Sequence, residues 1–322
     1  MHLVSVKLFF LIVFIFFFNS CITPLPKQGI PESATYMKKL PNKVFGSKRS
    51  YLIHIPNAYK ADKSMPLVII IHGAFSTAKE MERQSGFIEL ADKEKFIAVY
   101  PNGAYGIFGL LQHWNAGHCC GKAASDNIDD VGFLDMVIAD VAERFDIDKK
   151  RIYMVGFSNG GMLTYRFAAE RSEVVAAIAT VGATLGGRAS EDDSIWMVPH
   201  PSRPVPLVSF HGKQDLNVPY EGGRSPLKRN TREIFSIEQS MKFWVENNKC
   251  EDTPVTENLY QGIIARDTWT AINNDNSEVI LYTIEGWEHK WPGKYFTEKL
   301  RDDHPLKGFD AAEIIWQFFS NH

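Results

Sequence analysis

Residues 156–161 place a serine among three glycines, and this short segment restricts the fold more than any other part of the chain. An apolar run at residues 152–155 comes directly before it, and a helix-favouring segment at residues 162–171 follows. Side chains two positions either side of Ser158 would clash in so tight a turn, which is why glycines stand there. The pattern predicts a strand, a sharp turn that exposes the Ser158 hydroxyl, and a helix.

The rest of the chain alternates short apolar runs with amphipathic segments. Residues 67–71 are continuously apolar, which is typical of a strand buried on both faces of a sheet. Other strands are expected at residues 49–55, 96–100, 152–155, 176–181, 207–210 and 279–284. The clearest helix runs from Asp129 or Asp130 to Phe145, with apolar residues three and four positions apart. The alternation predicts a mostly parallel central sheet with helices on both faces, an α/β fold.

The composition excludes several classes of protein. A chain with 45% hydrophobic and 23% charged residues resembles an ordinary globular domain and not a disordered or collagen-like one. The net charge of -3 provides no basic field, so nucleic acid is not an expected partner. The sequence does not indicate an oligomeric state.

The first 45 residues are expected to lie outside the catalytic domain. Lys7 precedes an unbroken apolar run at residues 8–18, which is too short to span a bilayer and is typical of a secretory signal peptide. We therefore expect a signal peptide at residues 1–20, alternatively of the lipoprotein type with a lipid on Cys21 as the only membrane contact. Four prolines favour a tether at residues 21–45, followed by one domain at residues 46–322. The protein is predicted to be secreted, periplasmic or attached to the cell envelope.

Two further predicted strand ends carry residues that could act with Ser158. In a fold of this kind the chain order is serine, then acid, then histidine. Asp215 follows the strand expected at residues 207–210, and His289 follows the one expected at residues 279–284. We expect Ser158 to attack a carbonyl carbon in acyl transfer, His289 to transfer the proton and Asp215 to orient the imidazole. His304 is the alternative base.

A His-Gly turn directly after residues 67–71 offers a site for the developing negative charge of the reaction. The backbone N–H of Ala74, or alternatively that of Phe75, is expected to join the N–H of Asn159 in an oxyanion hole. The helix that starts after Ser158 would point its amide dipoles at the same place.

Five sequence blocks in this order resemble the secreted polyhydroxybutyrate depolymerase and feruloyl esterase family of α/β-hydrolases. The blocks lie at residues 114–121, 129–133, 156–162, 211–220 and 289–293. The resemblance implies an α/β-hydrolase that hydrolyses carboxylic esters without a cofactor, with Ser158, Asp215 and His289 as its triad. Substrates in that family are polyhydroxyalkanoates, feruloylated or acetylated polysaccharides, or small esters. The alternative function is a catalytically silent surface lipoprotein that keeps the fold and binds polymer or glycan.

Three tryptophans lie in segments next to the expected triad: Trp114, Trp287 and Trp291. We expect their indole rings to bind substrate, because they could stack on a planar acyl group or a sugar ring. The alternative is that they wall the core. With a stacking pocket, a hydroxycinnamoyl ester should be accepted at least as well as a short aliphatic one.

The cysteines suggest at most one disulfide bond in the exported domain. Cys250 is expected to pair with Cys119 or Cys120, which would close a loop of about 130 residues. A metal site built from His113, His118 and these two neighbouring cysteines matches no standard zinc spacing, so no metal is expected.

Overall fold

The computed structural model describes residues 34–44, 47–106, 110–226, 232–272 and 275–322. The predicted signal peptide, Cys21 and most of the predicted tether lie outside these residues. Within the described ranges, no helix is both long enough and apolar enough to cross a membrane.

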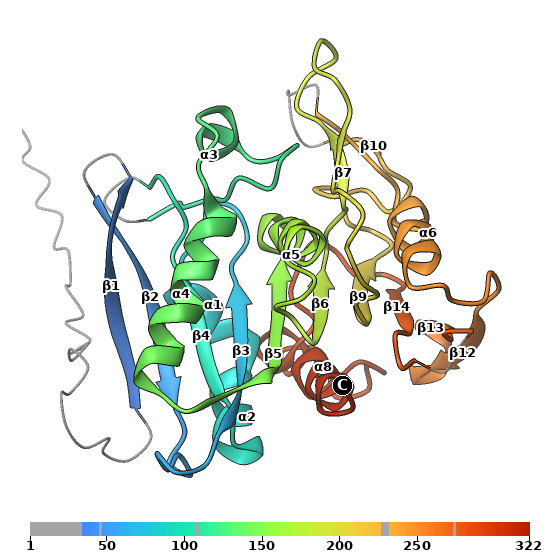
Figure 1. The fold of residues 1–322 in the computed structure, drawn as a ribbon. Helices are drawn as coiled ribbons and strands as arrows, with labels where there is room; N and C mark the ends of the chain where they lie inside the picture. Colours follow the sequence, from blue (N-terminus) through green and yellow to red (C-terminus); the bar gives the residue numbers. More distant parts are fainter. Residues whose placement is uncertain (1–33, 45–46, 107–109, 227–231, 273–274) are drawn as a thin grey trace, which may run out of the picture.

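Ten described strands form one sheet, whose order is β1-β2-β4-β3-β5-β6-β9-β14-β13-β12 (Figure 1). Their bounds are β1 (Ala34–Val44), β2 (Ser47–Ile55), β3 (Met65–Ile71), β4 (Ile97–Pro101), β5 (Ile147–Phe157), β6 (Ala177–Val181), β9 (Leu207–Gly212), β12 (Val255–Leu259), β13 (Ile264–Trp269) and β14 (Val279–Ile284). The inner strands from β4 to β14 pair in parallel. The outer pairs on both sides are antiparallel. The prediction of a mostly parallel sheet is confirmed.

Helices cover both faces of this sheet. Their bounds are α1 (Ala78–Ser85), α2 (Phe87–Glu94), α3 (Gly121–Ser125), α4 (Asp130–Arg144), α5 (Asn159–Glu170), α6 (Ile237–Asn247), α7 (Lys294–Thr297) and α8 (Ala311–Ser320). Alternate residues of β3 point to opposite faces: Leu67 and Ile69 join a core with α4, α5 and α6, and Val68 joins one with α1, α2 and α8. A strand between two helical layers must be apolar on both faces, which explains the unbroken run at 67–71.

The helix expected near Asp129 has the predicted start and end. Asp129 caps α4 by accepting a hydrogen bond from the backbone N–H of Gly132 at 2.8 Å, and Phe145 is the residue after its last turn. The cap provides a partner for one of the N–H groups that a helix start leaves unpaired.

The predicted domain boundary near residue 45 is wrong, because the sheet already includes β1. This strand pairs with β2, and its Tyr36 and Leu40 side chains are buried in the core. Pro41 lies where the register shifts between Lys39 and Lys43. A proline is tolerated there because β1 is an edge strand, so the missing N–H breaks no inner hydrogen-bond ladder.

Four short strands form a second sheet in the order β10-β11-β7-β8. Their bounds are β7 (Gly186–Arg188), β8 (Trp196–Met197), β10 (Gly223–Arg224) and β11 (Glu233–Ile234). In Figure 1, β7 and β10 stand at the end of the molecule toward which β3 and β5 run. The small sheet therefore lies beside the carboxyl ends of the parallel strands, where open α/β sheets place their binding sites.

Candidate active site

Ser158 is the single residue between the last residue of β5 and the first residue of α5. Its backbone has φ +54° and ψ -122°, a conformation that costs an ordinary residue about 1–3 kcal/mol. A Cβ at Gly156 would overlap the carbonyl oxygen of Gly160, and one at Gly160 would overlap the carbonyl oxygen of His72. These close backbone approaches are the reason for the glycines, and the predicted strand–turn–helix junction is present.

The structure brings Ser158, His289 and Asp215 into one hydrogen-bonded chain, although they follow three different strands. The Nδ1 atom of His289 lies 2.6 Å from Oδ2 of Asp215, and its Nε2 atom lies 2.8 Å from the Ser158 Oγ. A carboxylate can only accept, so Nδ1–H donates to it and Nε2 is left to accept from the serine hydroxyl. The alternative base, His304, instead accepts the backbone N–H of Leu306 in its own loop.

The Asp215 carboxylate is held firmly on its other side. Its Oδ1 atom accepts backbone N–H groups from Asn217 at 2.9 Å and Val218 at 2.8 Å. The neighbouring His211 is buried, and this burial lowers its pKa to about 4. His211 is therefore neutral near pH 7 and leaves the negative charge of Asp215 to act on His289.

The backbone amides expected to form the oxyanion hole flank the serine. The Phe75 N–H donates to the carbonyl of Gln112 at 2.7 Å, so of the two alternatives the structure favours Ala74. Asn159 is fixed by two bonds to one residue: its Oδ1 accepts the Trp114 N–H at 2.8 Å and its Nδ2 donates to the Trp114 carbonyl at 3.1 Å. This clamp holds the first turn of α5, whose free N–H groups lie next to Ser158.

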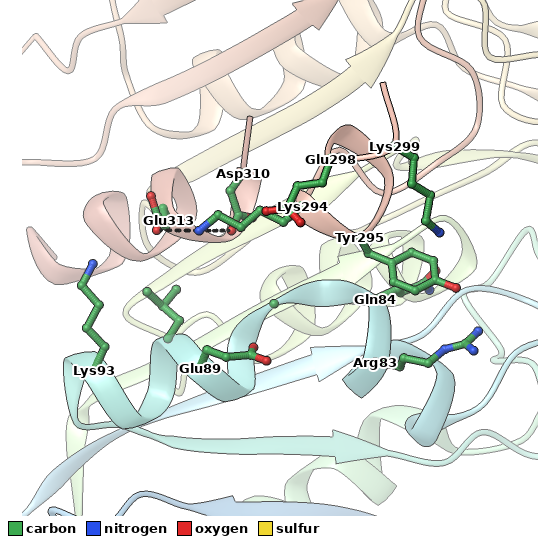
Figure 2. A pocket seen from close by; sticks show the side chains of 12 residues that line it. Arg83, Gln84, Glu89, Lys93, Lys294, Tyr295, Glu298, Lys299, Asp310 and Glu313 are labelled. Carbon is green, nitrogen blue, oxygen red and sulfur yellow. Dashed lines mark hydrogen bonds and ion pairs between the residues drawn. The ribbon is translucent and has the colours of Figure 1, made fainter. Parts of the chain in front are cut away.

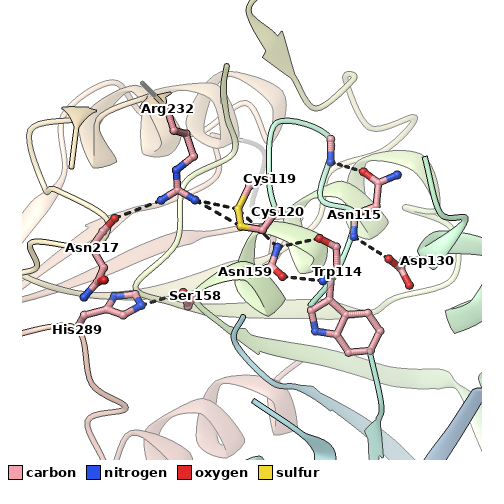
Figure 3. The surroundings of a disulfide bond; sticks show 11 residues. Trp114, Asn115, Cys119, Cys120, Asp130, Ser158, Asn159, Asn217, Arg232 and His289 are labelled. Atoms are coloured by element: carbon pink, nitrogen blue, oxygen red, sulfur yellow. Dashed lines mark hydrogen bonds between the residues drawn. A yellow bond between two sulfur atoms is a disulfide. The ribbon is translucent and has the colours of Figure 1, made fainter. Parts of the chain in front are cut away.

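A buried ion pair supports the loop that makes this clamp. Arg49 Nη2 donates to Asp130 Oδ1 at 2.7 Å. Asp130 Oδ2 accepts the backbone N–H of Asn115 at 2.7 Å, a contact drawn in Figure 3. The guanidinium of Arg49 also lies over the Phe133 ring, 3.8 Å from its centroid. Although Asp130 is the first residue of α4, its carboxylate does not cap that helix but fixes the 114–115 loop.

The tryptophans expected to bind substrate are part of the core. Trp114 and Trp291 are fully buried, and the Trp114 indole donates to the His72 carbonyl at 2.9 Å. Trp287 is only 8% exposed, and its indole donates to the carbonyl of Lys290. The stacking prediction is wrong for these three, because all three side chains are buried.

A cavity of about 700 Å³ opens beside Ala74 instead. Trp196 and the exposed Phe75 ring provide its aromatic surface, and Cys119, Cys120 and Arg232 also line it. Sequence reasoning missed Phe75, Trp196 and Arg232 as cavity residues. Only the structure shows that a Cβ at Gly117 would overlap the indole of Trp196.

A second hollow, of about 730 Å³, lies between α2 and the segments around α7 and α8 (Figure 2). Its wall mixes basic and acidic side chains, and Lys294 contacts both Asp310 and Glu313 there. None of the residues expected to take part in catalysis lines it. The first cavity is lined by Ala74, an expected oxyanion donor, so we place the candidate active site beside that cavity.

The cysteine pairing differs from the prediction. Cys119 is joined to Cys120, its neighbour in the chain, and Cys250 is a free thiol. The Cys250 side chain is buried and donates to the carbonyl of Ser277, and burial raises its pKa to about 11. Cys250 does not line the cavity. Among the residues that the structure describes, no group of three His, Cys, Asp or Glu side chains could hold a metal ion.

Comparisons with known proteins agree with this architecture. Feruloyl esterase B of Piromyces equi is 30% identical over 207 residues, which are 64% of this chain but 37% of that protein, so the chain spans little more than a third of it. Putative esterase NocK of Nocardia uniformis subsp. tsuyamanensis is 26% identical, over 85% of this chain and 79% of that protein.

Solved structures with little sequence identity share the fold. The acetyl xylan esterase from Aspergillus awamori superposes with a TM-score of 0.56 at 15% identity, covering 89% of this chain and 99% of the other. The family model described as "Esterase PHB depolymerase" matches residues 49–216, more than half of the chain, including Ser158 and Asp215. The chain has the α/β-hydrolase fold and belongs to the PHB depolymerase esterase family.

Proposed function

We propose that this protein is an exported serine esterase that hydrolyses carboxylic esters through an acyl-enzyme. The observation that carries the proposal is the position of His289, which contacts Ser158 at 2.8 Å and Asp215 at 2.6 Å. The names of the relatives, feruloyl and acetylxylan esterases among them, support ester hydrolysis. The apolar run at residues 8–18 supports export.

In the first half of the reaction, the Ser158 Oγ attacks the ester carbonyl carbon while its proton moves to Nε2 of His289. The carbonyl oxygen becomes an oxyanion, which the N–H groups of Ala74 and Asn159 stabilise. Asp215 stabilises the imidazolium without taking its proton. Nε2 then protonates the departing alcohol, and the acyl group remains on Ser158.

In the second half, His289 removes a proton from a water molecule, which attacks the acyl-enzyme and releases the acid. The same two amides bind the second oxyanion. Each oxyanion donor is worth about 10²- to 10³-fold in rate in a well-studied protease. The clamp between Asn159 and Trp114 therefore contributes to catalysis by keeping one of these donors in place.

The cavity supports an acyl or alcohol group with a planar face. Phe75 and Trp196 replace the three buried tryptophans as the stacking surface, and an aromatic contact of this kind is worth about 0.5–1.5 kcal/mol beyond burial. We expect a hydroxycinnamoyl ester to be hydrolysed at least as well as a short aliphatic ester. If kcat/KM for a hydroxybutyrate oligomer is about tenfold above that for methyl ferulate, the difference exceeds what aromatic stacking provides. The protein then acts as a depolymerase.

Burst kinetics test the proposed function directly. Purified protein mixed with p-nitrophenyl acetate should release one equivalent of p-nitrophenol rapidly if acylation is faster than deacylation, and Ser158 should become labelled by a fluorophosphonate. The Ser158→Ala variant should show neither turnover nor labelling. If the wild-type protein hydrolyses no ester and takes no label, the silent polymer- or glycan-binding alternative replaces the esterase.

A further inference from the structure

Arg232 is a buried cation to which the described residues offer no free carboxylate. Its side chain is only 8% exposed. The acidic group that interacts with it electrostatically is Asp215, whose oxygens already accept from His289 and from two backbone N–H groups. Burial of a guanidinium without an ion-pair partner is costly, because the lost hydration is not replaced by an opposite charge. The positive charge of Arg232 is therefore available to a ligand.

The hydrogen bonds of Arg232 orient its side chain without neutralising it. Nη1 donates to the sulfur of Cys119 at 2.9 Å and to that of Cys120 at 3.4 Å, and Nη2 donates to the carbonyl of Asn217 at 3.3 Å (Figure 3). Sulfur is a weak acceptor, and a guanidinium carries more N–H donors than these contacts use. The planar donor fork is thus fixed in direction and keeps capacity for a stronger acceptor.

The other basic side chain of the cavity is already paired. Arg188 also lines the cavity, but its Nε donates to Glu233 at 2.8 Å. The acidic residue of the lining, Asp193, is exposed and accepts a hydrogen bond from the neutral Ser190 hydroxyl. The buried His118 beside Trp196 is neutral, since burial lowers its pKa to about 3. Among the described residues, Arg232 is therefore the basic group of this cavity that forms no ion pair.

We propose that Arg232 is a specificity-determining residue, which binds a carboxylate that the ester substrate carries apart from the bond attacked by Ser158. The guanidinium and a carboxylate match in geometry and charge, and such pairs form the stronger class of hydrogen bond. The carboxylate belongs either to the acyl part, as in a half-ester of a dicarboxylic acid, or to the alcohol part, as in an ester of an acidic hydroxyl compound. This inference rests on the proposed esterase function.

Two matched substrate pairs separate the two sources of the carboxylate. For the acyl part, kcat/KM is measured for mono-p-nitrophenyl adipate and p-nitrophenyl hexanoate. For the alcohol part, it is measured for p-acetoxybenzoate and p-acetoxybenzamide. We expect the wild-type protein to favour the anionic member of at least one pair by about tenfold, and the pair in which this happens identifies the source.

The Arg232→Gln variant should remove this preference. A hydrogen bond to a charged group is worth about 1.5–3 kcal/mol, so kcat/KM for the anionic ester should fall about 10- to 100-fold while the neutral ester changes less than about twofold. Arg224→Gln is the matched control, since Arg224 is an exposed arginine on β10 of the small sheet and pairs with Glu191. It should leave the anionic-to-neutral ratio unchanged.

A binding measurement keeps the proposal testable without turnover. Calorimetry on the Ser158→Ala protein should detect adipate but not the neutral adipamide. If Arg232→Gln lowers kcat/KM for the anionic and the neutral ester equally, Arg232 has a structural role and the proposal is overturned. A wild-type protein that favours the neutral esters and does not bind adipate would also overturn it. If no ester is hydrolysed but adipate still binds, the proposed esterase function fails and the anion site stands.

Discussion

Ser158 and the cavity beside it are built from different kinds of chain segment. Ser158 joins β5 directly to α5. Both are long elements, and residues of both are buried in the same hydrophobic core. The cavity wall instead combines the turn at Ala74, the loop around Cys119, Trp196 on β8 and Arg232 directly before β11. The proposed nucleophile is thus placed by regular structure, whereas the proposed substrate surface is formed by short and irregular segments far apart in sequence.

This difference separates the effects that mutations should have. Changes near β5, β9 and β14 should alter the rate for every ester, because all esters pass through the same oxyanion. Changes in the cavity wall should alter the ratio between esters and leave the common chemistry intact. The changes in rate for every ester should be larger than the changes in the ratio between esters.

Replacing Ser158 by alanine should have the largest effect. Removal of the nucleophile should lower kcat for any ester by about 10⁴- to 10⁶-fold, and the melting temperature should change little, since no core contact is lost. The measurement is hydrolysis of p-nitrophenyl acetate, with Ser320→Ala as control because Ser320 is exposed on α8. A Ser158→Ala protein that retains more than a hundredth of the activity would remove Ser158 from the mechanism.

His289→Ala should be almost as damaging as Ser158→Ala, because groups that transfer one proton act as a unit. His304→Ala should be mild, since His304 contacts the backbone of Leu306 and not the serine. Steady-state kcat values for both variants on one neutral ester decide between them. The reverse ranking would make His304 the base and would contradict the geometry around His289.

Arg49→Met should reduce stability and activity together. It leaves the Asp130 carboxylate buried without its partner, a change that typically costs about 3–5 kcal/mol, and it frees the loop that clamps Asn159. Urea unfolding measures the loss of stability, and kcat on a neutral ester measures the loss of activity. Arg151→Met breaks an exposed ion pair with Asp148 and should cost no more than about 1 kcal/mol. Equal costs for the two variants would show that the buried pair does not support the loop.

Trp196→Ala should have the smallest effect, and only on the choice of substrate. Loss of the indole should lower kcat/KM for methyl ferulate relative to p-nitrophenyl acetate by about two- to tenfold, the equivalent of the stacking energy. Trp269→Ala is the control, because Trp269 is a half-buried tryptophan on β13 that does not line the cavity. If both substrates lose activity in parallel, Trp196 supports the fold of the small sheet and does not bind the acyl group.

Several core features could be predicted because they leave a local pattern. A strand between two helical layers has to be apolar on both faces, as residues 67–71 are, and a helix that packs on one side shows its three- and four-residue spacing, as α4 does. β1 was missed because Pro41 within it and three prolines before it imitate a tether, and an edge strand tolerates a proline. The small sheet was missed because its strands are only two or three residues long, too short for any periodicity.

The sequence by itself determined the parts of the site whose chemistry follows from residue type and chain order: the serine between glycines, and an acid and a histidine after later strands. It also predicted that these three side chains act together, since the carboxyl ends of parallel strands share one edge of the sheet. Only the tertiary structure decided which aromatic rings line the cavity, which cysteines pair, and that Arg232 lacks a carboxylate partner among the described residues. These depend on where long loops pack against each other, and packing between distant segments leaves no periodic signal in the chain.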